Sequence, residues 1–351
     1  MHMATKIKEI DALRGIAAVL VSFIFHQHYL TGQSRSGPLD GLPIFSWLHQ
    51  NGWVMVDLFF VISGFIFALV YLEGGKIEAG GKAFARARFA RLYPLHLATL
   101  CLAAVLLAIG TPASVGYARS DLWHFILNIF MLQESGLQTG LSFNTPSWSI
   151  SVEVYCYCVF YFLASRARRY LYPISAIICV ASVLATFADS GTIDHIARGF
   201  GGFFAGVIAQ RYSNASRKNL LIWGLVGCCL LSVARFGFSF GVLLGVGIFP
   251  AIVLAAPRIA FLGKRAFVWL GDRSYSIYLL HAPIYMGINI LVFGGERIPD
   301  EVVWLAIIGA WTAILIVSDV SFRTFESPLR KWLTRPRQAA DADLSSIGQT
   351  T

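Results

Sequence analysis

The chain has 351 residues, of which 56% are hydrophobic and only 13% are charged. A soluble globular domain has roughly 25% charged residues, so this composition excludes an ordinary soluble protein and predicts a membrane protein. The formal net charge of +9 is compatible with nucleic-acid binding, but the placement of the cations argues against it.

The apolar residues form long continuous runs, which predict spanning helices rather than the alternating segments of a β-barrel. A helix needs about 20 mostly apolar residues to cross a bilayer. Residues 122–133 are too few and predict an amphipathic or re-entrant helix, and residues 72–82 and 136–147 predict loops. Ten spans are expected, at residues 12–31, 52–72, 92–110, 148–164, 171–188, 197–211, 220–234, 238–256, 274–294 and 302–321.

The predicted fold class is therefore all-α, with about ten transmembrane helices in one bundle. Residues 1–337 are expected to form a single integral-membrane domain. Residues 338–351 are polar and are expected to form a disordered cytoplasmic tail.

The basic residues gather at every second connection between the predicted spans. All but five of the 28 Lys and Arg residues lie at these connections or at the span ends beside them. The positive-inside rule then places both termini in the cytoplasm, with an even number of spans. The five others, one in each remaining connection, are Arg35, Arg119, Arg198, Arg235 and Arg297.

The first span carries ionisable residues at both ends. Arg14 and His28 lie about 40° apart on an ideal helix, whereas Arg14 and His26 lie about 120° apart. Either His28 shares the face of Arg14, or a kink or π-bulge turns His26 towards it. A structural interpretation, in which Arg14 reaches the headgroups and both histidines mark the outer interface, also remains open.

Asp57 and Glu153 lie inside predicted spans, where each needs a cation, a hydrogen-bond donor or a proton. Glu153 is the clearest buried acid, and a histidine would be a suitable partner for it. For Asp57, a functional role and a structural ion pair are both open. Ser63 and Gly64, in the span of Asp57, are small residues that permit close helix contact. Because acids inside spans are commonly functional, Glu153 and Asp57 are catalytic candidates.

Three arginines, Arg86, Arg88 and Arg91, precede the third span on the predicted cytoplasmic side. Guanidinium groups bind phosphate oxygens in a bidentate manner, so the cluster is a candidate phosphate clamp. The alternative is a set of topology determinants that contact anionic lipid. In the ninth span, His281 precedes Pro283 and shares roughly one face with Tyr275 and Tyr278.

Six motifs occur in order along the chain: DALRGIAA, FH, DLFFVISGF, RFARLYP, PSWSISVE and SYSIYLLHAP. Together they resemble membrane-bound acyltransferase family 3, the bacterial O-acyltransferases, which include polysaccharide and O-antigen acetylases. The similarity extends from residue 9 to about residue 330. The resemblance implies a ten-span core and transfer of an acyl group, commonly acetyl, from an acyl-CoA to a sugar hydroxyl.

The resemblance also assigns roles to individual residues. It implies that Arg14 and His26 are the basic residue and the histidine of the first span, and that Arg88 and Arg91 bind the donor. The remaining matches are Trp148, Ser149 and Glu153 in a WS-x-x-x-E element, and Ser274, Tyr275, Tyr278 and His281 in the late element.

The chain departs from the family pattern in the first span. The family usually has ten residues between the basic residue and the histidine, whereas eleven residues separate Arg14 from His26. Phe25 stands where the family histidine would fall. A bulge that holds one extra residue, or a different register of Arg14, would account for the difference.

These observations suggest an O-acyltransferase that moves an acyl group, most commonly acetyl, from acyl-CoA to a hydroxyl of exopolysaccharide, lipopolysaccharide or another glycoconjugate. His26 would be the general base or would take the acyl group itself, and Glu153 or Asp57 would orient its imidazole. His28 is an alternative reactive histidine. The expected donor site contains Arg14, Arg86, Arg88 and Arg91, and the expected acceptor or oxyanion residues are Trp148, Ser149, Tyr275, Tyr278 and His281.

Acyl-CoA is expected as a co-substrate, with no tightly bound cofactor and no metal. The expected partners are a carbohydrate or glycolipid acceptor and the lipid bilayer, without nucleic acid, and the expected location is the bacterial inner membrane. The alternative is a secondary transporter or flippase of acylated sugars, although the chain lacks the internal repeats and paired interrupted helices common in transporters.

Overall fold

A computed structural model describes residues 7–32, 41–112, 120–186, 191–213 and 239–335, together with Gly224 and Gly227. Every regular element in these ranges is a helix, which confirms the predicted all-α class. The expected span at 220–234, apart from its two glycines, and the expected tail at 338–351 lie outside the described residues.

The first half of the chain contains the first span and four further α-helices. The first span is α1 (Lys8–Val19), a π-helix (Leu20–Ile24), a 3₁₀ turn (Phe25–Gln27) and α2 (His28–Thr31). There follow α3 (Pro43–Asn51), a 3₁₀ turn (Gly52–Val54), α4 (Met55–Phe67), a π-helix (Ala68–Glu73), a 3₁₀ turn (Lys76–Ala79), α5 (Gly80–Ile109) and α6 (Leu122–Ile129).

The second half begins at a 3₁₀ turn (Thr145–Ser147) and α7 (Trp148–Arg166). It continues with a 3₁₀ turn (Arg168–Tyr170), α8 (Leu171–Ala185), α9 (Gly191–Arg211), α11 (Phe240–Leu243), a π-helix (Leu244–Ile248) and α12 (Phe249–Ala255). The last elements are two 3₁₀ turns (Ala256–Arg258 and Ala260–Gly263), α13 (Arg265–Phe293), α14 (Val303–Ser321), a π-helix (Phe322–Glu326) and α15 (Ser327–Thr334).

Seven helical segments in the described ranges are long and apolar enough to cross a membrane. They match seven of the ten predicted spans and make the protein a multi-pass membrane protein. The first span and α9 are also helical, but both carry many polar or glycine residues and neither is among the seven. The count of ten spans and the cytoplasmic placement of both termini therefore stay predictions. The seven segments are Pro43–Glu73, Lys76–Ile109, Thr145–Arg166, Arg168–Ala185, Phe240–Arg258, Arg265–Phe293 and Val303–Thr334.

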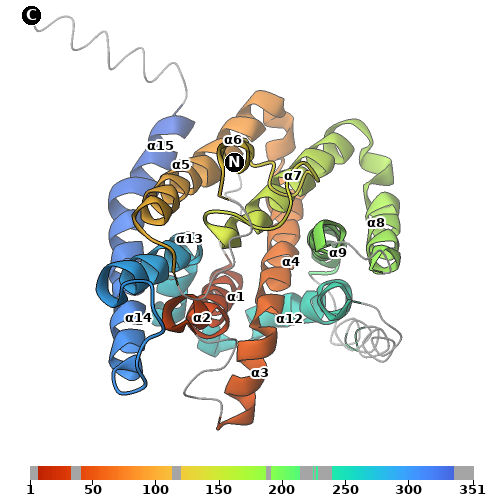
Figure 1. Ribbon diagram of the computed structural model, residues 1–351. Helices are drawn as coiled ribbons and strands as arrows, with labels where there is room; N and C mark the ends of the chain where they lie inside the picture. Colours follow the sequence, from red (N-terminus) through yellow and green to blue (C-terminus); the bar gives the residue numbers. More distant parts are fainter. Residues whose placement is uncertain are drawn as a thin grey trace, which may run out of the picture.

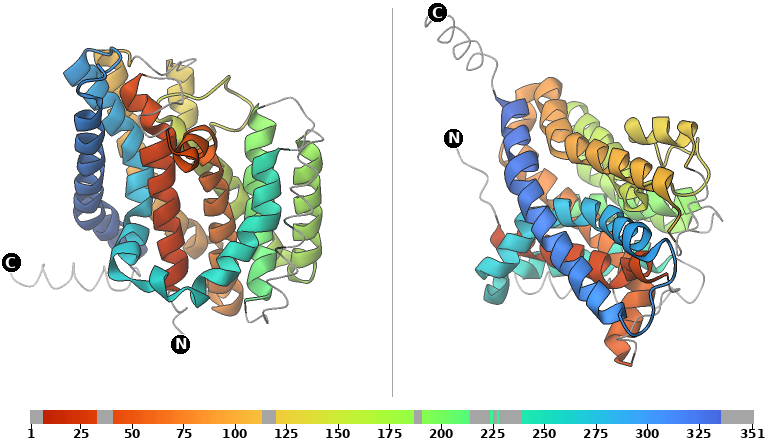
Figure 2. Two further views of the ribbon diagram at one scale, coloured as in Figure 1. Left: turned by 90° about the horizontal axis from the view of Figure 1, so that it is seen from below. Right: turned by 60° about the vertical axis from the view of Figure 1, so that its left-hand side comes forward.

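Other helices surround the first span. It packs mainly against α13, while α4 packs against α9, which also contacts α8. Figure 1 shows α14 and α15 on one side of this centre and α8 on the opposite side, and Figure 2 shows the long helices running roughly alongside one another. The first span is therefore enclosed on several sides, so its polar side chains face protein.

The π-helix at Leu20–Ile24 explains the extra residue in the first span. A π-turn holds one more residue than an α-turn, so the helix continues beyond it with nearly the register of a chain one residue shorter. Of the two explanations offered by the sequence, the structure shows the bulge. The bulge lies between Arg14 and His26, and the 3₁₀ turn that follows contains His26 itself.

The long helix α5 begins earlier than the sequence predicts. The expected third span starts at residue 92, whereas α5 starts at Gly80 and passes through Pro94 without interruption. The expected loop at 72–82 is largely helical for the same reason. Consequently the arginine cluster lies on the helix itself, where Arg88 and Arg91, three residues apart, share a face.

Candidate functional site

The deepest polar contact of the first span joins two histidines from opposite ends of the sequence. Nδ1 of His26 lies 2.8 Å from Nε2 of His281 on α13. His281 is fully buried and His26 is 9% exposed. The π-helix upstream of His26 and the close packing of the first span against α13 bring the two rings together.

The second contact of His281 decides which nitrogen of His26 is basic. Nδ1 of His281 lies 3.3 Å from the carbonyl oxygen of Ile277, which can only accept a hydrogen bond. A neutral, buried His281 therefore carries its proton on Nδ1 and accepts at Nε2. The hydrogen-bond network then assigns the proton of neutral His26 to Nδ1, which donates to His281, and the basic lone pair to Nε2.

The neighbouring residues help to place His26. The ring of Tyr29 stacks on the imidazole of His26, with ring centroids 4.8 Å apart, and its hydroxyl lies 2.7 Å from Oγ1 of Thr145. His28, the alternative reactive histidine, has its Nδ1 2.8 Å from the carbonyl oxygen of Phe25. Both His26 and His28 line the same cavity.

Asp57 does not orient His26 in this structure. One carboxylate oxygen of Asp57 accepts from Nε of Arg198 at 2.9 Å, and the other accepts from Nη2 of Arg198 at 3.3 Å. The guanidinium of Arg198 also lies over the ring of Trp53, 4.4 Å from its centroid. Of the two alternatives for Asp57, the geometry shows the ion pair, which joins α4 to α9. The sequence had grouped Arg198 with the loop cations, but it is buried within α9.

Glu153 also has partners other than histidine. Ser63 donates to its Oε1 at 2.7 Å, and the Tyr157 hydroxyl donates to the same oxygen. These two hydroxyls supply the donors that a carboxylate in a span needs. Ser63 is therefore more than a packing residue, because it ties α4 to α7.

Three adjoining cavities run from the start of the first span towards His26. The arginine cavity, about 270 Å³, is lined by Ile7, Asp11, Arg14, Ile66, Leu69, Val70, Arg91, Asp272, Ser274, Tyr275, Phe322, Glu326 and Arg330. The central cavity, about 80 Å³, is lined by Arg14, Val56, Phe59, Phe60, Ile62, Ser63, Ile66, Phe67, Arg88, Arg91, Leu92, Ser149, Ile150, Glu153, Tyr157, Ser274, Tyr275 and Tyr278. The histidine cavity, about 370 Å³, is lined by Phe25, His26, His28, Tyr29, Trp53, Val56, Leu141, Trp148, Asp194, His195 and Arg198.

Each of these cavities shares lining residues with the next one. Arg14 and Arg91 line both the arginine and the central cavities. Val56 lines both the central and the histidine cavities. The cavities thus lie in a row from the arginines towards His26.

The arginines occupy different places along this route. Nε of Arg88 is buried without a hydrogen-bond partner in the described part of the chain, although aromatic rings surround its guanidinium. Arg14 donates to Oγ of Ser274 at 2.9 Å and pairs with Asp11 at 3.2 Å. Arg86 is exposed and lines none of the three cavities, because it lies two residues from Arg88 on a different helix face.

The predicted acceptor or oxyanion residues lie at different places in the site. Tyr278 donates to the carbonyl oxygen of Pro146 at 2.9 Å, and its hydroxyl lies 3.0 Å from that of Ser149 in the central cavity. Tyr275 donates to the carbonyl of Leu92 on α5 at 2.5 Å. Trp148 lines the histidine cavity instead. His281, which was grouped with these residues, lies beside His26.

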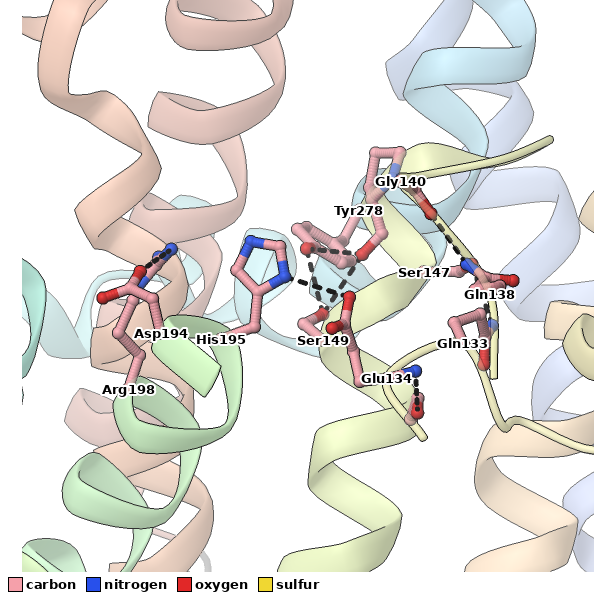
Figure 3. A network of polar contacts seen from close by, with 12 residues as sticks. Gln133, Glu134, Gln138, Gly140, Ser147, Ser149, Asp194, His195, Arg198 and Tyr278 are labelled. Carbon is pink, nitrogen blue, oxygen red and sulfur yellow. Dashed lines mark hydrogen bonds and ion pairs between the residues drawn. The ribbon is translucent and has the colours of Figure 1, made fainter. Parts of the chain in front are cut away.

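Sequence reasoning did not single out His195 and Glu134. Nδ1 of His195 on α9 lies 2.9 Å from Oε1 of Glu134, in the chain that follows α6 (Figure 3). The ring of His195 stacks on Trp148, with centroids 3.9 Å apart. The motif DHIAR, residues 194–198, with two acid–base groups beside an arginine, was the available signal. Within the described ranges, no cluster of three or more His, Cys, Asp or Glu residues could hold a metal ion.

The fold and the site define a class: a multi-pass helical membrane protein in which arginine-lined cavities lead to a buried histidine pair. The model of the acyltransferase domain family, acyltransferase family 3, matches residues 7–322. The chain belongs to this family, as its motifs indicated.

Curated relatives are consistent with this membership. The chain is 32% identical to acyltransferase MdmB of Streptomyces mycarofaciens over 203 residues, 54% of this chain and 50% of the relative. It is 24% identical to peptidoglycan O-acetyltransferase OatA of Listeria monocytogenes over 93% of this chain and 56% of the relative. It is also 24% identical to putative peptidoglycan O-acetyltransferase YrhL of Bacillus subtilis over 87% of this chain and 55% of the relative. The chain thus spans about half the length of these relatives. No solved structure matches it.

Proposed function

We propose that this protein is an O-acyltransferase of the bacterial cytoplasmic membrane that transfers an acetyl group from acetyl-CoA to a carbohydrate hydroxyl. The observation that carries the proposal is the row of adjoining cavities from Arg14, Arg88 and Arg91 to His26. Family membership supports the acyl-transfer chemistry, and relatives named as peptidoglycan O-acetyltransferases support a carbohydrate acceptor.

The donor enters from the end of the bundle at which α1 begins. Its phosphates bind Arg88 and Arg91, whose guanidinium groups match phosphate oxygens, and Arg14 adds positive charge at the junction of two cavities. About 18 Å separates Arg14 from His26 along the helix, so a phosphate-bound donor needs an extended arm to reach the histidine. The pantetheine arm of coenzyme A is such a group.

His26 acts as the general base. Nε2 of His26 takes the proton of the acceptor hydroxyl while the hydroxyl oxygen attacks the thioester carbon. The carbon–sulfur bond then breaks, the coenzyme A thiolate leaves, and it takes up the proton from His26. His281 holds the ring by accepting from Nδ1, which keeps the basic atom on the opposite edge of the imidazole.

Labelled acetyl-CoA tests this function with the purified protein in lipid nanodiscs and lysozyme-released peptidoglycan fragments as acceptors. We expect free coenzyme A and label on the glycan, and we expect His26→Ala to lower the rate by roughly 10²-fold or more, the usual contribution of a general base. A His26→Ala protein that inserts normally and keeps full transfer would refute the mechanism. Transfer from acetyl phosphate but not from acetyl-CoA would refute acetyl-CoA as the donor. Movement of the glycan across the membrane without thioester cleavage would indicate a transporter.

A further inference from the structure

A third histidine, His195, faces the histidine cavity from α9. His195 and His26 both line this cavity, although they come from different helices. The side chain of His195 is 22% exposed, whereas that of its partner Glu134 is only 4% exposed. The imidazole therefore lies between a buried carboxylate and an open space.

Two contacts hold the His195 ring in one orientation. Glu134 accepts from Nδ1, and Trp148 stacks on the ring with an interplanar angle of 16°. Glu134 is itself anchored to α7, because its backbone N–H donates to Oγ of Ser151 at 3.2 Å. A ring fixed by a carboxylate on one edge and an indole on one face cannot easily turn.

The carboxylate of Glu134 also determines whether Nε2 of His195 donates or accepts a hydrogen bond. An ionised carboxylate only accepts, so Nδ1 of a neutral His195 carries the proton and Nε2 carries the lone pair. Figure 3 shows Nε2 turned away from Glu134. In the described part of the chain, Nε2 of His195 has no hydrogen-bond partner. It is therefore an acceptor available to a hydroxyl in the cavity.

The rest of the wall is also suited to hydroxyl groups. Asp194 is 36% exposed, and Arg198 lies 3.9 Å from it at the side of the cavity. The guanidinium of Arg198 lies over the Trp148 ring, 5.1 Å from its centroid, and His195 stacks on the same ring. Trp148 thus supports both His195 and Arg198. Because Asp57 already holds the guanidinium of Arg198, Nε2 of His195 and the carboxylate of Asp194 are the groups left to meet a polyhydroxyl ligand.

We propose that the Glu134–His195 pair binds the carbohydrate acceptor in the histidine cavity, with Nε2 of His195 accepting a hydrogen bond from one sugar hydroxyl. This contact places a neighbouring hydroxyl of the same sugar beside His26. The inference rests on the proposed acetyl transfer and adds an acceptor-binding residue to it.

Two substitutions test the roles of the two ring nitrogens of His195 separately. The amide of Asn lies close to the position of Nδ1, so His195→Asn keeps a donor to Glu134 but removes Nε2. The longer Gln side chain reaches the position of Nε2, so His195→Gln offers an acceptor there and loses the donor to Glu134. Because Glu134→Gln keeps the shape of the side chain, it tests whether the carboxylate sets the tautomer.

The test uses full-length protein in a deletion strain and measures total alkali-labile acetate on the envelope glycans, which does not require the acceptor to be known. We expect His195→Asn to lower this acetate at least tenfold and His195→Gln to keep clearly more. Acetyl-CoA binding to each purified variant, measured by calorimetry, should equal that of the unaltered protein. Wild-type acetate with His195→Asn, or equal acetate with the two variants, would overturn the proposal.

The control is a second histidine–carboxylate pair outside the cavities described above. Nδ1 of His124 lies 2.8 Å from Asp121, and the two hydrogen bonds from His124 lower the pKa of that carboxyl group. His124→Asn and His124→Gln should leave the acetate unchanged. If the unaltered protein adds no acetate to the deletion strain, the proposed function fails. If it does add acetate and the His195 variants add as much, only the acceptor-binding role of His195 fails.

Discussion

Buried or partly buried charged side chains in this protein tie helices to one another. Asp57 on α4 pairs with Arg198 on α9, and Arg273 on α13 pairs with Asp319 on α14. Taking two charges out of water is expensive, and their attraction offsets this only when the geometry is good. An intact buried ion pair therefore adds little to the stability of the fold. Removing one partner lowers the stability strongly, because the other charge stays buried without compensation.

The Asp57–Arg198 pair gives a direct test of this asymmetry. Their side chains are 0% and 6% exposed, so Asp57→Ala leaves a buried guanidinium without its carboxylate. We expect a loss of about 3–5 kcal/mol of stability, seen as a lower thermal midpoint in detergent. The control is Arg297→Ala, which breaks an exposed pair, with side chains 61% and 75% exposed, and should cost less than about 1 kcal/mol. Equal shifts for the two variants would contradict the structural role of Asp57.

At the scale of single elements, departures from regular α-helix position the site. The π-helix at Leu20–Ile24 and the 3₁₀ turn at Phe25–Gln27 lie immediately before and around His26. Regular α-helix from Arg14 onwards would put His26 on a different face, about 100° away, because one residue turns the helix by that angle. Local helix irregularities of this kind often occur at functional sites.

Shortening the first span by one residue should therefore be tolerated. Deletion of Leu20 converts the π-helix to an α-helix and keeps His26 in nearly its present orientation. We expect this variant to retain most of its acetyl transfer in the nanodisc assay. Deletion of both Leu20 and Val21 turns His26 by about 100° and should abolish transfer. A single deletion that is as inactive as the double deletion would show that the bulge itself is required.

Close approach of α4 and α9 depends on a glycine that the sequence marked for helix contact. A Cβ atom at Gly64 would collide with the backbone carbonyl of Phe203. Backbone atoms cannot move aside as a side chain can, so we expect Gly64→Ala to destabilise the protein by about 1–3 kcal/mol, measured as a lower thermal midpoint. Gly309→Ala on α14 is the matched control, because nothing lies within 4 Å of its added methyl group. An unchanged midpoint for Gly64→Ala would show that the two helices can separate without penalty.

At the scale of the whole molecule, the cavities lie in a row along the first span. The arginine cavity lies where α1 begins, and the histidine cavity lies beyond the π-helix. This arrangement separates the arginines from the buried imidazole of His26. If the arginine end faces the cytoplasm, the donor approaches from the compartment that the positive-inside rule assigns to both termini.

Fusions to the C-terminus test this orientation. With the C-terminus in the cytoplasm, a green fluorescent protein fusion should be bright and an alkaline phosphatase fusion inactive, because the phosphatase matures only outside. The same two reporters fused after a predicted outer connection should give the opposite result. Phosphatase activity at the C-terminus would contradict the cytoplasmic placement of both termini.

Much of the candidate site could be predicted from local sequence, because a rare polar residue within an apolar run is conspicuous. His26, Glu153, Asp57 and the arginine cluster were each visible in this way. Their partners were not, since the contacts of His26 with His281 and of Asp57 with Arg198 span 255 and 141 residues of sequence. His195 was missed because it stands in a stretch that resembles a loop connection.

The sequence by itself determined that this chain is an all-helical, multi-pass membrane protein of the acyltransferase 3 family. Hydrophobic length and motif order are local properties of the chain, and the cost of exposed backbone in lipid leaves few alternatives. Only the tertiary structure decided that His26 meets His281, that Glu153 is held by hydroxyls, and that His195 faces the same cavity as His26. These contacts depend on helix rotation and close helix packing, which are set by interactions between distant segments and not by the residues adjacent to each side chain.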